Sequence, residues 1–451
     1  MRKILLLSLL WLLITTSTEA QEIINRDNEI AKMINEISAE NIEANVNKLV
    51  SFGTRHTLSE TESDERGVGA ARRWVKSQFE LYAQESGGRL KAEIDEYTIK
   101  ADNRRIPEDA LSGNALGILQ GTDPDDDRVF LITGHLDSRA TDVMDVSIDA
   151  PGANDDASGV AMVMELARIM SKREFPATII FMAVTGEEQG LYGATNMAEK
   201  MLVDSVNLVA VLNNDMIGNS TSSGTNLHDN TQVRVFSEGV PAYETEEMER
   251  MRRYTSGEND SKSRQLARYI KEVGERYVDQ LEVKLIYRND RFLRGGDHTP
   301  FARKGFTAVR MCEMNENYYH QHQTVRMEDG IQYGDLPEFM DFEYARKNAG
   351  VNLATLANLA WAPSIPENVV VDVSGLSNET KLLWDDPTIG EKPKGYYILM
   401  RETFQPLWEK KFYVEGNEAI IPYSKDNYFF AVQAVDEEGH ESLAVFPVPK
   451  R

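Results

Sequence analysis

Short apolar runs alternate with amphipathic segments over most of this chain, and this alternation limits its fold more than any other feature. The runs "RVFLITG", "ATIIFMAVTG" and "VNLVAVLNND" are short enough for buried strands and end in glycine or polar residues. Between them lie stretches with helical periodicity, such as "SGVAMVMELARIMSK", which opens with Ser158 as the expected helix cap. Strands that alternate with helices build a sheet covered by helices. The sequence therefore predicts an α/β fold around a mainly parallel mixed sheet.

Segments on either side of this region carry periodic signals of their own. Apolar residues three and four positions apart predict a helix from Asn25 to about Phe52, another over "GVGAARRWVKSQFELYA", and a long one from about Phe342 to Leu359. The stretch 219–260 is polar and irregular, as in "NSTSSGTNLHDN". We expect it to be a surface insertion near the functional site, because it directly follows a predicted strand.

Both ends of the chain differ from this α/β region. "MRKILLLSLLWLLITTSTEA", residues 1–20, has a basic start, a short apolar run and small residues before the expected cleavage point, so it predicts a signal peptide. Beyond a proline-containing linker, residues 363–451 hold short strand-like runs separated by turns. We therefore predict an α/β domain over 21–362 and a small all-β sandwich over 363–451. The placement of Trp384 and Tyr428 in the last part resembles a fibronectin type III domain.

The chain is strongly acidic, with a formal net charge of −24. Such a charge argues against nucleic acid or an anionic membrane as the partner. No apolar run after residue 20 is long enough to span a membrane, so we expect no membrane insertion. Because the chain starts with a predicted signal peptide, we expect an exported protein, periplasmic or extracellular. The single cysteine, Cys312, lies in the apolar run "FTAVRMCE" and is expected to be buried. It allows no intramolecular disulfide, so stability must come from a core or bound metal. The oligomeric state stays open.

Acidic residues and a histidine follow the predicted strands where these strands end. They are His135 and Asp137 in "VFLITGHLDS", Asp155 and Asp156 in "PGANDDASG", Glu187 and Glu188 in "FMAVTGEEQG", and Asp215 in "VAVLNNDMIG". Taken singly, each is more often a residue of a solvated loop or of a turn than a ligand. In a mainly parallel sheet, however, the carboxyl ends of strands meet at one edge. Negative charge that converges there needs a cation to offset it.

Carboxylates and imidazoles without a thiolate form a donor set that suits zinc or a similar divalent metal. One histidine with two or more acids can hold one zinc ion. A second histidine would let a bridging carboxylate hold two, and "NENYYHQHQTVR" offers His320 and His322. A carboxylate left over from Glu187 and Glu188 could then act as the general base for an activated water. The residues alone thus indicate metal-assisted hydrolysis.

The motifs "GHLDS", "GANDDASG", "TGEEQGLYG", "NNDMIG" and "DHTPF", in this order, closely resemble the zinc aminopeptidases of metallopeptidase family twenty-eight. The resemblance covers roughly residues 25–362 and implies an α/β globule that binds two Zn²⁺ ions. It assigns His135 and Asp215 to one zinc, Glu188 and a late histidine to the other, Asp155 to both, Glu187 to the general base and Asp137 to the carboxylate that orients His135. It also implies a cis peptide between Asp155 and Asp156, and a supporting role without metal binding for Asp297 and His298. The alternative for Asp297 and His298 is a capped turn ahead of Pro300.

The late histidine is the ligand that the motif leaves ambiguous. In the family it commonly follows Tyr and precedes Ser or Thr, with an Asp a little later. His320 follows Tyr319, whereas His322 has Thr324 two residues on and lies in "QHQTVR", which resembles a bacterial variant. No Asp follows either histidine at the expected distance. Side chains two apart in an extended loop point the same way, so direction excludes neither. We choose His322 and keep His320 as the alternative, which leaves Tyr318 or Tyr319 as the candidate for stabilising the oxyanion.

The predicted function is that of an exported di-zinc metallopeptidase, most simply an aminopeptidase that removes N-terminal residues from peptide substrates. A glutaminyl cyclase-like acyltransferase with one zinc shares the fold and most of the motifs, and it stays an alternative. So does a degenerate, non-catalytic binding protein, although every ligand and base position is filled here. Within the hydrolases, carboxypeptidase and dipeptidase activities also stay open, because no motif identifies the residues that select the side chain.

Overall fold

The structure is a computed structural model that describes residues 26–450, so the predicted signal peptide lies outside the described residues. The helices are α1 (Asn28–Asn35), α2 (Ala39–Val50), α3 (Gly67–Ala83), α4 (Ser158–Met170), α5 (Glu187–Gly190), α6 (Tyr192–Val203), α7 (Glu246–Thr255), α8 (Lys262–Tyr277), α9 (His298–Arg303) and α10 (Phe342–Trp361). Short helical turns cover Ala153–Ala157 and Pro337–Phe339. Within the described chain, no helix combines the length and the apolar composition that crossing a bilayer requires.

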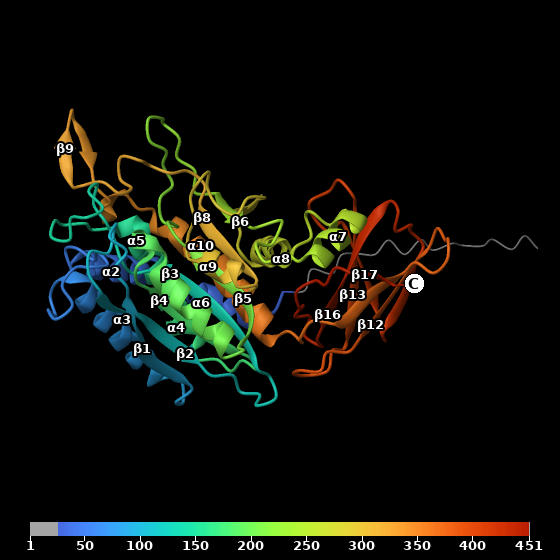
Figure 1. Cartoon of the computed structure of the whole chain (residues 1–451). Coiled ribbons are helices and arrows are strands. Elements are labelled where there is room, and N and C mark those ends of the chain that lie inside the picture. The colour runs from blue at the N-terminus through green and yellow to red at the C-terminus, as the bar shows by residue number, and fades with distance from the viewer. Residues whose placement is uncertain (1–25, 451) are drawn as a thin grey trace, which may run out of the picture.

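The strands form one large sheet and three small ones (Figure 1). They are β1 (Leu90–Ile99), β2 (Ala110–Leu119), β3 (Arg128–His135), β4 (Thr178–Val184), β5 (Asn207–Asn214), β6 (Gln232–Phe236), β7 (Glu282–Ile286), β8 (Ala308–Glu313), β9 (Arg326–Glu328), β10 (Ile331–Tyr333), β11 (Glu367–Asp372), β12 (Thr380–Asp385), β13 (Gly395–Glu402), β14 (Lys410–Val414), β15 (Glu418–Ile421), β16 (Tyr428–Val435) and β17 (Val448–Lys450).

The large sheet has eight strands in the order β1-β2-β4-β3-β5-β8-β6-β7. Its centre, β4-β3-β5-β8, is parallel, whereas β1 and β2 run antiparallel to their neighbours. At the other end, β6 is antiparallel to β8 and parallel to β7. The predicted mainly parallel mixed sheet is therefore confirmed. Because the four central strands share one direction, their carboxyl ends lie at a single edge of the sheet.

Helices cover both faces of this sheet, which explains why its central strands read as continuous apolar runs. Phe130 and Ile132 of β3 belong to the core that includes α3, α4 and α8, beyond which α1, α2 and α10 pack. Leu131, which points to the other face, belongs to a second core with α6 and α9. The alternation of side chains along one strand thus supplies two cores. Cys312 of β8 is buried and free, as predicted.

Several sequence predictions need correction. The helix expected from Asn25 to Phe52 is two helices, because Asp27 and Ser38 each cap a separate N-terminus with their side chains. Ser158 does not cap α4, since the cap residue is Ala157 and the Ser158 hydroxyl instead donates to the carbonyl oxygen of Asn154.

The stretch 219–260 is only partly an irregular surface insertion. It contains α7 and also β6, which pairs with β7 and β8 inside the large sheet. The sequence signal for β6 is weak, because five residues with the charged Arg234 in the middle give little apolar contrast against polar flanks. What remains irregular lies before β6 and around α7.

After α10 the chain forms a four-stranded sheet, β15-β12-β11-β17, and a three-stranded sheet, β14-β13-β16. One hydrophobic core joins the two, with Leu382 and Trp384 from the first sheet against Ile398 and Phe430 from the second. The two small sheets share one core and are antiparallel except where β17 pairs in parallel with β11, and they agree with the predicted all-β part. The finer likeness to fibronectin type III and the domain boundaries at 362 and 363 stay predictions.

Buried charges join these small sheets, called here the C-terminal sheets, to the α/β part. Glu441 pairs with Arg276 of α8 at 2.8 Å between Oε1 and Nη2. Asp260 lies between Arg268 of α8 and Arg401 of β13, at 3.0 and 2.6 Å. Separating the two parts would leave these buried groups without partners, which is costly. The contact is therefore a specific one.

His440 gives this contact a pH dependence. Its Nδ1 lies 2.6 Å from Asp436 Oδ2 and its Nε2 lies 3.5 Å from Asp27 at the start of α1. Burial alone would lower the pKa of His440, but Asp436 and Asp27 raise it above its usual value. A folded-state pKa above the unfolded value of about 6.5 means that the stabilisation is complete below that pH and is lost as the pH rises through the folded pKa.

We therefore expect His440→Asn to lower the free energy of unfolding by about 2 kcal/mol at pH 5.5, and by progressively less as the pH approaches 9. Denaturant unfolding of both proteins across this range measures the difference. His228→Asn is the matched control, because His228 also faces a carboxylate, Asp341 at 3.7 Å, but is exposed. A His440 effect that is constant with pH would contradict the assignment.

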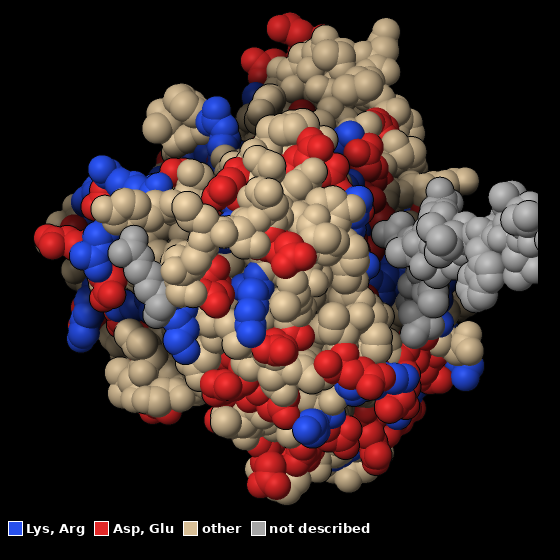
Figure 2. Space-filling model, turned by 90° about the vertical axis from the view of Figure 1, so that its right-hand side faces the viewer, with Lys and Arg blue, Asp and Glu red and all other residues tan. Residues whose placement is uncertain are grey.

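Acidic residues are also abundant on the surface. Figure 2 views the molecule from the side of the C-terminal sheets, and Asp and Glu side chains gather over the lower part of this face with some Lys and Arg between them. The net charge of −24 therefore needs no metal site to explain it. Evidence for such a site has to come from the buried acids instead.

Candidate metal centre

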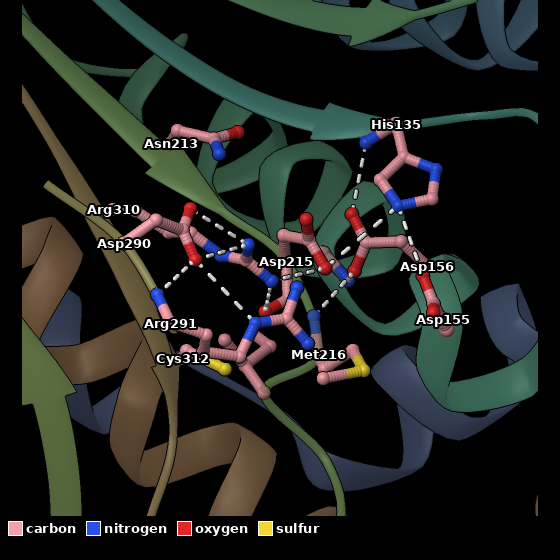
Figure 3. Close-up of polar contacts among 12 residues, drawn as sticks. His135, Asp155, Asp156, Asn213, Asp215, Met216, Asp290, Arg291, Arg310 and Cys312 are labelled. Carbon is pink, nitrogen blue, oxygen red and sulfur yellow. Dashed lines mark hydrogen bonds and ion pairs between the residues drawn. The ribbon is translucent and has the colours of Figure 1, made fainter. Parts of the chain in front are cut away.

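The sequence-predicted residues meet at the carboxyl edge of the four parallel strands. His135 ends β3, Asp215 directly follows β5, and Glu187 and Glu188 open α5 directly after β4. Asp155 lies in the turn Ala153–Ala157 that leads into α4, and its peptide bond to Asp156 is cis, as the resemblance implied. His322 lies in the loop after β8. Figure 3 shows His135, Asp155 and Asp215 with their polar neighbours.

Two groups of side chains come within ligand distance of each other and share Asp155. The first cluster consists of His135, Asp155 and Asp215. Within it, His135 Nε2 lies 3.0 Å from Asp155 Oδ1 and 3.8 Å from Asp215 Oδ1.

The second cluster consists of Asp155, Glu188 and His322. Here His322 Nε2 lies 2.9 Å from Asp155 Oδ2 and 3.0 Å from Glu188 Oε1. Asp155 therefore directs one oxygen to each cluster. This is the arrangement that a carboxylate bridging two cations requires.

The residues present fit a divalent metal. Both clusters combine carboxylate oxygens with imidazole nitrogens and contain no thiolate, which suits zinc. Glu188 Oε1 is buried and accepts no hydrogen bond from the described residues, although His322 Nε2 is near. Burial alone would lower the pKa of His322, but Glu188 and Asp155 raise it to about 10. The carboxylates thus hold a surplus of negative charge for which a cation is the natural partner.

Asp137 supports the site, but not in the way that was predicted. The Nδ1 of His135 faces the backbone oxygen of Asp137 at 2.9 Å, whereas the Asp137 carboxylate is 3.9 Å away. Since a carbonyl oxygen can only accept, Nδ1 carries the proton and Nε2 is free to bind a metal. The backbone of Asp137 therefore orients His135.

The carboxylate of Asp137 has a different task. It accepts the backbone N–H groups of Gly186, Glu187 and Glu188 at 2.9 to 3.2 Å, and the Thr57 hydroxyl at 2.6 Å. These bonds fix the turn that presents both glutamates, in the manner of a helix cap supplied from another segment. Loss of this carboxylate would release Glu187 and Glu188 together.

Two more buried carboxylates hold the turn that carries Asp155. Asp156 accepts the backbone N–H of His135 at 2.8 Å and that of Met216 at 3.1 Å, so it ties the ends of β3 and β5 to the turn (Figure 3). Asp335 accepts the N–H groups of Asn154 and Asp155 at 2.8 and 2.7 Å. Burial raises the pKa of Asp335 to about 7, against these two bonds, which lower it.

Glu187 lies beside both clusters and is partly exposed. Burial of its carboxyl group raises its pKa well above the usual value, and Asp215 and Glu188 add to the effect, while His135 opposes it. It is the one carboxylate of the Glu187–Glu188 pair that belongs to neither cluster. A carboxylate with this position and a raised proton affinity is suited to proton transfer.

The structure distinguishes His320 from His322. His322 belongs to the second cluster, whereas the ring of His320 stacks on Phe339 with centroids 3.7 Å apart. Tyr319 packs edge-on against Tyr333 and Tyr318 is exposed. None of the contacts described for these tyrosines reaches either cluster, so the candidate for stabilising the oxyanion stays open.

Asp297 and His298 lie near the clusters without joining them. Asp297 occupies the cap position of α9, but its side chain makes no capping bond, so the capped-turn alternative is not supported. Both of its oxygens are buried and accept no hydrogen bond from residues 26–450. Burial, with Asp137 and Asp215 nearby, raises the pKa of Asp297 to about 8. His298 instead bonds through Nε2 to the backbone oxygen of Asn289 at 2.7 Å.

Three further residues of the site were not found from the sequence. Gln321 donates from Nε2 to Asp155 Oδ2 at 3.3 Å. Asp335 holds the Asp155 turn, as described above. Arg310 of β8 lies 2.9 Å from Asp215 Oδ1 through Nη2. Only Arg310 could have been suspected from the sequence. It is a charged residue inside the apolar run "FTAVRMCE", and a buried arginine needs an acidic partner.

One cavity of the described chain is remote from these residues. It encloses about 360 Å³ between the C-terminal sheets and the α/β part. Its lining includes Arg128 and Asn207, the first residues of β3 and β5, whereas the clusters lie beyond the last residues of the same strands. The cavity is therefore at the opposite edge of the sheet and contributes nothing to the clusters.

Curated relatives resemble the chain over almost its whole length. A probable zinc metalloprotease of Leptosphaeria maculans is 46% identical over 424 residues, which cover 94% of this chain and 97% of the relative. A probable zinc metalloprotease of Pyricularia oryzae is also 46% identical, over 94% of this chain and 85% of its own length. The family model described as Peptidase family M28 matches residues 114–335, the stretch that holds all the residues of both clusters.

Solved structures share the fold at low sequence identity. The LapA aminopeptidase of Legionella pneumophila superposes with a TM-score of 0.53 at 20% identity, over 75% of this chain and 76% of that one. An aminopeptidase from Aneurinibacillus sp. strain AM-1 gives a TM-score of 0.52 at 14% identity, over 73% and 95%. The sheet, the motifs and the family match agree with the similarity to probable zinc metalloproteases, and the chain belongs to peptidase family M28.

Proposed function

We propose that the protein is a di-zinc exopeptidase that hydrolyses the first peptide bond of peptides with a free N-terminus. The observation that carries this proposal is the shared Asp155, whose two oxygens lie 3.0 and 2.9 Å from the histidines of different clusters. The names of the relatives support zinc and proteolysis. The names of the solved structures support aminopeptidase specificity.

In this proposal the first cluster holds one zinc ion and the second cluster holds the other. His135 and Asp215 would bind at the first position, Glu188 and His322 at the second, and Asp155 at both. Zinc bound there would polarise the scissile carbonyl group and lower the pKa of a water molecule. Everything else in the reaction is assigned to side chains of the chain itself.

Glu187 is the proposed general base. It takes a proton from the attacking water while the oxygen of that water forms a bond to the peptide carbonyl carbon. It then returns the proton to the leaving amine nitrogen as the carbon–nitrogen bond breaks. Asp137 positions Glu187 through the backbone bonds at the start of α5. A surplus of carboxylates beside the reacting bond favours a substrate with a protonated α-amine.

The location and the C-terminal sheets complete the proposal. Residues 1–20 would direct export to the periplasm or the extracellular space, and residues 363–451 would form a fibronectin type III-like domain. The docking of that domain through Glu441 and Asp260 supports a role in holding the peptidase part together.

The test is a substrate scan on zinc-loaded protein with aminoacyl substrates, free peptides and the same peptides blocked at the N-terminus. We expect cleavage of the free peptides one residue at a time and at least about a hundredfold lower rates on blocked peptides. Removal of zinc by a chelator should abolish turnover, and added zinc should restore it. Cleavage of blocked peptides only would contradict the aminopeptidase assignment. Formation of pyroglutamate without peptide cleavage would favour the glutaminyl cyclase alternative.

A further inference from the structure

A row of alternating charges leads away from the first cluster. Asp215 pairs with Arg310, whose Nη1 in turn lies 2.9 Å from Asp290 Oδ2. Arg291 continues the row, with Nε 3.4 Å from Asp290 and Nη1 3.0 Å from Glu316. The sticks of Figure 3 show Asp215, Arg310 and Asp290 side by side. The Arg310 guanidinium group therefore places a permanent positive charge next to Asp215, one of the proposed zinc ligands.

Arg310 and the first cluster use the same atom. Asp215 Oδ1 lies 2.9 Å from Arg310 Nη2 and is also the Asp215 oxygen that lies 3.8 Å from His135 Nε2. Both side chains are buried, so water does little to screen the guanidinium charge. Arg310 thus makes the electrostatic potential in the first cluster less negative, which makes the cluster less attractive to a divalent ion.

Within residues 26–450, no arginine or lysine forms an ion pair with Glu188, the carboxylate that belongs to the second cluster alone. Among residues 26–450, the ion pair of the Glu188 carboxylate is with His322. Arg105 reaches Glu188 only at its backbone oxygen, at 2.6 Å. The two clusters share Asp155 and have one histidine and one private carboxylate each. They differ mainly in that the private carboxylate of the first cluster is already paired with a cation.

We propose, building on the zinc binding proposed above, that Arg310 makes the two zinc positions unequal by weakening the first cluster relative to the second. Asp290 moderates this effect, because its negative charge lies on the far side of the guanidinium group and offsets part of it. Arg310 is then a residue that sets metal affinity through Asp215. A purely structural arginine would instead support the site by holding Asp215 in place.

Opposite responses of two variants separate these roles. Arg310→Gln keeps a hydrogen-bond donor near Asp215 but removes the charge. The weaker of the two zinc-binding steps should then occur at a free zinc concentration that is lower by about tenfold or more. Asp290→Asn leaves Arg310 without its nearest balancing carboxylate, so the same step should move to higher free zinc. The stronger step should change in neither variant. Asp215→Asn should abolish the weaker step and leave the stronger one.

The measurement is bound zinc per chain in the purified full chain, as a function of free zinc set by a chelator buffer. Thermal unfolding without zinc shows whether each variant is folded. Arg346→Gln is the matched control, since Arg346 pairs with Glu343 on the exposed side of α10, and it should move neither step.

Weaker zinc binding in both Arg310→Gln and Asp290→Asn would overturn the proposal and leave Arg310 a structural residue. Two equal affinities in the unaltered chain would also overturn it, while zinc binding itself would still support the proposed function. A folded, unaltered chain that binds no zinc would overturn both.

Discussion

Replacing Glu187 with Gln is expected to lower kcat/KM by about 10² to 10⁴-fold while the bound zinc stays unchanged. Gln has the same shape as Glu but cannot accept a proton from water. The backbone N–H of Glu187 would still donate to Asp137 at 3.2 Å, so the turn before Glu188 should keep its shape. Initial rates on an aminoacyl substrate at saturating zinc, together with zinc content per chain, measure the two effects separately.

Glu328→Gln is the matched control for this experiment. Glu328 lies on β9, in the hairpin that projects from the molecule in Figure 1, and its side chain is exposed. The same chemical change should leave the rate there nearly unaltered. Retained turnover in Glu187→Gln would contradict the general-base assignment. Loss of zinc together with turnover would instead make Glu187 a metal ligand.

The sequence predicted the centre of the fold because the centre has the strongest pattern. The strands β3, β4, β5 and β8 are covered on both faces, so each appears as a continuous apolar run. The outer strands β6 and β7 are short and carry Arg234 and Lys284 between their apolar residues. Their place in the sheet depends on pairing with distant segments, which composition alone does not encode.

The sequence also predicted most of the candidate metal ligands, because they lie next to these strongly patterned strands. A polar residue that directly follows a buried parallel strand is confined to one edge of the sheet, so local sequence predicts its position. Asp335 lacks this constraint. It lies in a loop beyond the hairpin of β9 and β10. It meets the Asp155 turn through the N–H groups of Asn154 and Asp155, which donate to its carboxylate, and that of Ala153, which donates to its backbone oxygen.

The assumption that His320 and His322 point the same way was wrong. It requires an extended loop, but His322 has a left-handed backbone with φ of 54°, and the segment before it forms a turn in which His320 and Gln321 both donate to the backbone oxygen of Asn317. The turn directs the two rings to different surroundings. No periodic signal in "NENYYHQHQTVR" reveals that turn, since polar and aromatic residues fit it and an extended loop alike.

These two histidines allow a matched pair of variants with very different expected outcomes. His322→Ala removes the imidazole that lies 2.9 Å from Asp155 and 3.0 Å from Glu188, so we expect about one zinc ion fewer per chain and at least about a hundredfold lower kcat/KM. His320→Ala removes a ring that stacks on Phe339, so it should keep both zinc ions and lose only about 1 kcal/mol of stability. Zinc content, initial rates and thermal unfolding of both variants decide the matter. Equal zinc loss in both would show that the loop changes shape when zinc binds, because only then could a ring stacked on Phe339 matter as much as one that faces Asp155.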